Sequence, residues 1–186
     1  MRGTTNNINV ERRTKILIIL GIAALIVAFQ PRIARAEWTV HHTQFVSILY
    51  ENEGDLETLF KRVDGSSLSR LFGGGKYSEE KLEKVVDELL RRVGELLGMR
   101  TKGVSVKIKL YKDKRTMGAE VFPFLKGNIA PAFYFAAQDT IYVSLDDLDA
   151  NILAHEFTHA LLYHHFDKPV PMVTQEILCQ YIDLNI

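Results

Sequence analysis

Residues 148–165, near the C-terminus, read LDANILAHEFTHALLYHH. Apolar side chains recur through it at helical spacing and Pro169 follows it, so we expect one helix over the whole stretch. Residues four positions apart lie on one face of a helix, one turn from each other. His155 and His159 are therefore predicted to present two imidazoles on the same side, with Glu156 beside them.

The pattern His155-Glu156-Phe157-Thr158-His159 is the HExxH arrangement of zinc hydrolases. Two neutral imidazoles can hold one zinc ion, and a carboxylate next to the bound water can accept its proton during attack on a carbonyl. The motif is short, and a helix with two partly buried histidines is the alternative explanation. The sequence therefore predicts a Zn²⁺ site with Glu156 as the catalytic base.

A zinc site of this kind needs a third protein ligand, and the sequence offers two candidates. His165 stands where a longer zinc motif ends, but that motif has glycine at the position of Leu162. If the helix continues, His165 lies about 240° round from His159 and faces away from the ion. The second candidate is Glu176, on a helix expected from about Met172 to Asp183. We favour Glu176, for which a surface glutamate on an amphipathic helix is the alternative.

HExxH followed by a helix of the form Pro171-x-x-x-x-Glu176-x-x-x-x-Tyr181 resembles the gluzincin peptidases, especially the short peptidase-MA-like proteins and minigluzincins. The resemblance covers most of the chain after Ser78 and implies His155, His159 and Glu176 as the zinc ligands. It also implies a zincin-like fold in which Glu156 is the general base.

The segments 132–135 and 141–143 look like the edge strand and return strand that precede the active-site helix in thermolysin-type enzymes. The resemblance implies that a peptide substrate binds this edge as an extended strand. Gln180 stands where that family commonly has a carboxylate, so we expect no obvious acidic partner for the ligands. Tyr181 is the nominated catalytic donor to the oxyanion, with Tyr134 and the His164-His165 pair as alternatives.

The rest of residues 37–186 predicts a single α+β domain with a small mixed sheet. Alternation from Val104 to Leu110 indicates a strand with one buried face, which we place at or near a sheet edge. Ser78 caps a helix that Gly98 ends. Further segments are expected as follows: strands at 44–50, 132–135 and 140–143, and helices at 55–63 and 114–121.

The outer face of the helix after Ser78 carries opposite charges four residues apart. The pairs are Glu80 with Lys84, Asp87 with Arg91, and Glu88 with Arg92. Such i,i+4 pairs are typical of a solvated helix face and need no ligand to explain them.

The N-terminal residues 1–36 have the layout of a signal peptide. Basic residues precede an apolar run at 16–29, and Ala34-Arg35-Ala36 offers a cleavage site after Ala36. The alternative is an uncleaved membrane anchor, because the run approaches the roughly 20 residues of a transmembrane helix. We expect export to the periplasm or the medium, or a domain tethered outside the cytoplasm.

Charge and cysteine content bear on the possible partners and on disulfide formation. Residues 1–36 hold six of the 23 basic and one of the 23 acidic side chains, so the remainder carries a net charge of −5. This mildly acidic body has no basic stripe, which argues against a nucleic-acid partner. Cys179 is the only cysteine, so no internal disulfide forms, and we expect it to be a packed thiol.

The sequence thus predicts a zinc-dependent peptidase that cleaves an extended peptide or protein chain. Two alternatives stay open. One is a catalytically weak or inactive binding module with the same fold. The other is a latent enzyme in which residues 37–76 cover the cleft until the chain is cut in the glycine- and serine-rich connector 64–76.

Overall fold

The computed structural model describes residues 37–64, 76–121 and 130–186, all within one compact unit, Glu37–Ile186. The apolar run 16–29 and the expected cleavage site lie outside the described residues, as does the connector at 65–75. Over the described ranges, no helix has both the length and the apolar character needed to span a bilayer.

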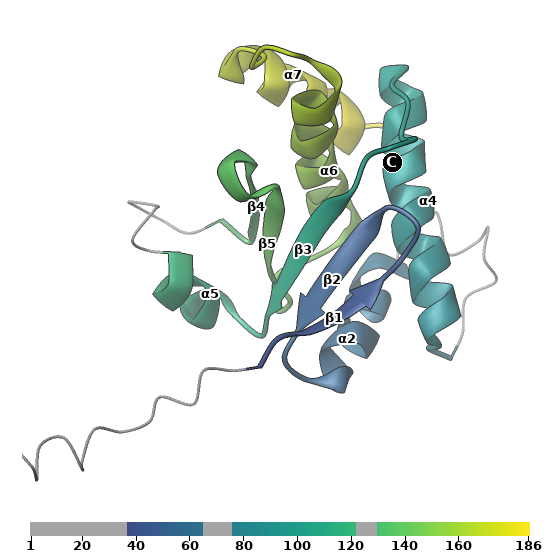
Figure 1. Cartoon of the computed structure of the whole chain (residues 1–186), viewed down its shortest axis with the longest axis vertical. Coiled ribbons are helices and arrows are strands. Elements are labelled where there is room, and N and C mark those ends of the chain that lie inside the picture. Colours follow the sequence, from purple (N-terminus) through teal and green to yellow (C-terminus); the bar gives the residue numbers. More distant parts are fainter. Residues whose placement is uncertain (1–36, 65–75, 122–129) are drawn as a thin grey trace, which may run out of the picture. The chain divides into compact units, whose positions relative to one another are not determined.

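The described residues form five strands, five α-helices and one short 3₁₀ turn (Figure 1). In chain order they are β1 (Thr39–His42), β2 (Val46–Tyr50), α2 (Glu53–Asp64), α4 (Glu79–Leu97), β3 (Val106–Tyr111), α5 (Lys114–Val121), β4 (Ala132–Phe135), η1 (Ala136–Gln138), β5 (Thr140–Ser144), α6 (Ala150–His165) and α7 (Met172–Asp183). The predicted α+β class is confirmed. The sequence analysis did not predict strand β1.

The five strands form one mixed sheet in the order β1-β2-β3-β5-β4. β2, β3 and β5 are parallel neighbours, whereas β1 and β4 pair antiparallel at the two edges. The prediction that the strand at 104–110 lies at or near an edge is wrong, because β3 is the central strand. Its alternation arises because Ile108 and Leu110 face the main core, while Lys107 and Lys109 point to the other face.

Helices α2, α4 and α6 contribute to the main core on one face of the sheet, where buried side chains of β2, β3 and β5 meet them. The other face carries a smaller cluster of Tyr111 and Tyr142 with side chains of α5. There Lys109 Nζ lies 4.2 Å from the ring centre of Trp38, which explains a lysine on the central strand.

Helix α6 is the element that positions the predicted motif. Asp149 caps it by accepting a hydrogen bond from the Ile152 amide at 2.8 Å. Buried residues lie on nearly all sides of α6, because it contacts α4, β4 and α7 as well as α2. In Figure 1, α7 packs against α6 and follows it after a short loop.

The idea that residues 37–76 are a removable cover is contradicted by the sheet. β2 is an internal strand, and its side chains Val46 and Ile48 are 2% and 0% exposed in the main core. Leu56 and Leu59 of α2 are equally buried. Removal of this segment would open the core rather than uncover a cleft.

Helix α4 begins at the cap Ser78 and ends at Gly98, whose φ of 67° is in the left-handed region, as predicted. The expected pairing of Asp87 with Arg91 is wrong, because Arg91 binds Glu88 and Glu95 instead. Asp87 accepts hydrogen bonds from the Thr43 hydroxyl and from the amides of residues 44 and 45, at 2.5, 2.9 and 3.2 Å. It therefore fixes the turn between β1 and β2 against α4.

We expect Asp87→Ala to lower the free energy of unfolding by about 1–3 kcal/mol, because two backbone amides and one hydroxyl lose a charged acceptor. Urea unfolding followed by circular dichroism measures this. The matched control is Glu80→Ala, since Glu80 makes an exposed ion pair with Lys84 in the described part of the chain and its loss should change the midpoint little. An Asp87 variant as stable as the Glu80 variant would contradict this role.

Candidate metal centre

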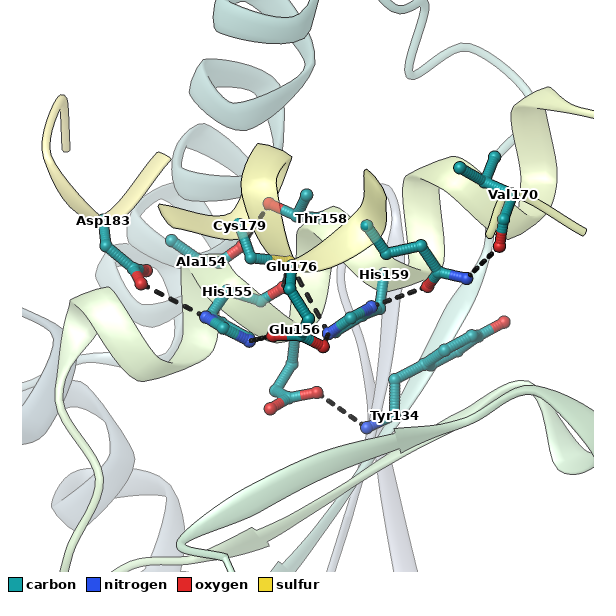
Figure 2. A network of polar contacts seen from close by, with 11 residues as sticks. Tyr134, Ala154, His155, Glu156, Thr158, His159, Val170, Glu176, Cys179 and Asp183 are labelled. Carbon is teal, nitrogen blue, oxygen red and sulfur yellow. Dashed lines mark hydrogen bonds and ion pairs between the residues drawn. The ribbon is translucent and has the colours of Figure 1, made fainter. Parts of the chain in front are cut away.

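Helices α6 and α7 bring the three predicted ligands together (Figure 2). Nε2 of His155 lies 3.7 Å from Oε2 of Glu176, and Nε2 of His159 lies 3.5 Å from Oε1 of the same carboxylate. The i,i+4 spacing on α6 places the two rings 5.2 Å apart, centre to centre. Two imidazoles on one helix therefore face one carboxylate on the next.

The Nδ1 atoms of both imidazole rings contact side chains of α7. Nδ1 of His155 lies 3.2 Å from Oδ2 of Asp183, and Nδ1 of His159 lies 2.8 Å from Oε1 of Gln175. The Gln175 amide in turn donates to the Val170 carbonyl at 2.7 Å. An Nδ1–H that donates outward leaves Nε2 with its lone pair free for a metal.

The expectation that no acidic residue contacts the predicted ligands is wrong, because Asp183 contacts His155. Position 180 is indeed not used in this way, but Asp183, two turns beyond Glu176, supplies the carboxylate for His155. Its other oxygen, Oδ1, is buried and has no hydrogen-bond partner in the described part of the chain. A carboxylate on Nδ1 raises the basicity of the imidazole as a ligand.

Cys179 was expected to be a packed thiol, and it is fully buried, at 0% exposed. Its Sγ nevertheless lies 3.5 Å from Nε2 of His159 and 3.6 Å from the carbonyl oxygen of His155. Among the described residues, His155, His159 and Cys179 each offer one ligand atom within 4.8 Å of the other two. Burial raises the pKa of the thiol, with the nearby carboxylate of Glu176 adding to the effect.

Glu156 lies beside the two histidines and is only 7% exposed. Its Oε2 accepts a hydrogen bond from the Tyr134 amide of β4 at 2.7 Å, which ties the carboxylate to the sheet edge. Burial raises the pKa of Glu156, while the neighbouring imidazoles of His159 and His155 and the Tyr134 amide act in the opposite direction. A carboxyl group with a raised pKa is a suitable proton acceptor.

A cavity of about 440 Å³ opens in front of these groups. His155, Glu156, His159 and Glu176 line one side of it. The rest of the wall comes from β4, η1, the end of α6 and the start of α7, and is mostly apolar. Its side chains include Tyr134, Ala136, Leu162, Tyr163, Val170 and Met172. The site is therefore reached through an apolar pocket beside the edge strand β4.

The residues predicted as donors to the oxyanion differ in their place relative to the cavity. Tyr181 is 45% exposed on α7 and does not line the cavity. Tyr134 lines the cavity, and its hydroxyl donates to Asp139 at 2.8 Å. His164 also binds Asp139, at 3.0 Å, so this aspartate joins the hairpin to the end of α6.

His165 ends α6 and faces a separate cavity together with Arg100 and Lys102. Because α6 continues through Leu162, the ring of His165 points away from His159, as the helical angle predicts. It is therefore not placed to be the third ligand.

The donor set fits a zinc ion. Imidazole nitrogen, carboxylate oxygen and thiolate sulfur are the ligands that zinc takes in proteins, and all three kinds converge here on one side of α6. Comparison with known proteins gives no further guidance: no family model, no curated protein and no solved structure matches the chain.

Proposed function

We propose that this chain is a zinc-dependent peptidase. The observation that carries the proposal is the convergence of the His155 and His159 Nε2 atoms on the Glu176 carboxylate, at 3.7 and 3.5 Å, with buried Glu156 at the same cavity. In this proposal the two histidines and Glu176 hold the ion.

Zinc in such a site supplies a bound water of lowered pKa and polarises the carbonyl that is attacked. The protein's own part is to fix the ligands and to move protons. Asp183 and Gln175 hold the rings of His155 and His159 in place through Nδ1. Glu156 takes the proton of the attacking water and returns it to the leaving amine.

The sheet edge offers a place for the substrate. β4 is an edge strand in contact with α6, so an extended peptide added there would run beside Glu156. The Tyr134 amide of that strand now donates to Glu156. The proposed partner is therefore a peptide or protein chain. We also propose that residues 1–36 direct export of the domain, either as a cleaved signal peptide or as an uncleaved membrane tether.

Metal removal tests the proposal. We expect the zinc-loaded chain to cleave an unstructured protein, to lose this activity after treatment with a chelator, and to regain it when zinc is restored. Fragments resolved by mass spectrometry give the readout, and a chelator already saturated with zinc is the control. Cleavage that continues in the metal-free chain would contradict the proposal. A chain that binds zinc but cleaves nothing would favour the binding module with the same fold.

A further inference from the structure

The thiol of Cys179 lies within the candidate metal centre rather than behind it. Cys179 follows Glu176 by three residues on α7, so the two side chains share the face that meets α6. In Figure 2, a dashed line joins Cys179 to the ring of His159.

The Nε2 atom of His159 has two close neighbours at once. Oε1 of Glu176 lies 3.5 Å away and Sγ of Cys179 also lies 3.5 Å away. One ring nitrogen carries at most one hydrogen, and without that hydrogen it faces a carboxylate oxygen with a lone pair. A single cation among the three atoms would satisfy all of them.

The separations agree with ligation of one ion. Ligand atoms each about 2.0–2.3 Å from a tetrahedral zinc lie roughly 3.3–3.6 Å apart. Three separations among the candidate ligands are near this range. His159 Nε2 lies 3.5 Å from both Glu176 Oε1 and Cys179 Sγ, and His155 Nε2 lies 3.7 Å from Glu176 Oε2. His155, His159 and Cys179 also each offer one ligand atom within 4.8 Å of the other two.

We infer that Cys179 is a fourth protein ligand of this metal, in addition to His155, His159 and Glu176. The inference rests on the proposed metal site. When the metal–sulfur bond forms, Sγ gives its proton to solvent and donates an electron pair to the ion, and no oxidation or reduction takes place. A fourth protein ligand would leave the ion without the open position that catalytic zinc sites keep, so hydrolysis would need a further coordination position for water.

Cobalt(II) absorption spectroscopy on the full chain tests this inference. The sequence contains one cysteine, so in the absence of added thiols a thiolate-to-cobalt charge-transfer band in the near ultraviolet reports Cys179 alone. We expect this band in the wild type and its complete loss in Cys179→Ser and Cys179→Ala. Both variants should still bind cobalt through the other three ligands, as seen from the visible ligand-field bands.

Two results would overturn the inference, and they separate it from the proposed function. Visible cobalt bands without a thiolate band in the wild type would remove Cys179 from the site and leave the peptidase proposal intact. A wild-type chain that binds no cobalt would overturn both. Serine is close to cysteine in size, so the serine variant separates loss of the thiolate from the effect of the cavity that alanine leaves. Circular dichroism checks that each variant folds. A band that does not change with protein concentration shows that one chain supplies the sulfur.

Discussion

Replacing Glu156 by glutamine is expected to lower kcat for peptide hydrolysis by about 10²–10⁴-fold, the usual contribution of a general acid–base group. Glutamine has nearly the same shape, and its carbonyl oxygen can still accept the hydrogen bond that the Tyr134 amide donates at 2.7 Å. It cannot accept the proton of water. The zinc content should therefore stay at the wild-type value while the activity falls.

Steady-state hydrolysis of an unstructured protein, measured together with zinc content, checks this expectation. Glu95→Gln on α4 makes the same chemical change at an exposed ion pair and should leave the activity unchanged. An active Glu156→Gln enzyme would remove Glu156 from the chemistry. Loss of zinc along with the activity would mean that the substitution had disturbed the ligands instead.

Replacing Phe157 by alanine is expected to cost about 3–5 kcal/mol of unfolding free energy, because it leaves a large cavity in the main core. Phe157 is 0% exposed and is the largest of the fully buried side chains in the described residues. It lies between Glu156 and Thr158 on α6, so it anchors the helix that carries the candidate metal site. A loss of this size is a large share of the 5–15 kcal/mol that typically stabilises a domain.

Denaturant unfolding measures the effect, and Tyr163→Ala on the same helix is the control. Tyr163 is 51% exposed, so its removal should cost much less than that of Phe157. Equal losses in the two variants would contradict the burial of Phe157 in the core. If the Phe157 variant is only partly folded, we expect its zinc binding to fall with the folded fraction.

The sequence predicted the helices best, because each carries its own signals. Ser78 and Gly98 bound α4, and the apolar period identified α6 and α7. Strand order was harder. The alternation in β3 reports that one face is buried, but it does not tell whether strands flank both sides. β1 was missed because its four residues, Thr39–His42, are mostly exposed and lack an apolar face.

The same limit applies to the site. His155, Glu156 and His159 were predicted as site residues from local spacing on one helix, whereas Cys179 and Asp183 contact these histidines only because α7 packs on α6. A signal was present, since both follow Glu176 by helical spacings of three and seven residues and share its face. Packing between the helices decides which side chains on such a face reach the candidate site, and local sequence does not encode this packing.

Zinc content per chain tests directly whether His155, His159 and Glu176 hold a metal ion. The wild type, His159→Ala and Glu176→Ala are purified in parallel, dialysed against a weak chelator and analysed for zinc. We expect about one zinc per chain in the wild type and much less in both variants, because each has lost a ligand. A wild-type chain without zinc would show that these residues do not form a zinc site, and a Glu176→Ala variant that keeps as much zinc as the wild type would show that Glu176 is not a ligand.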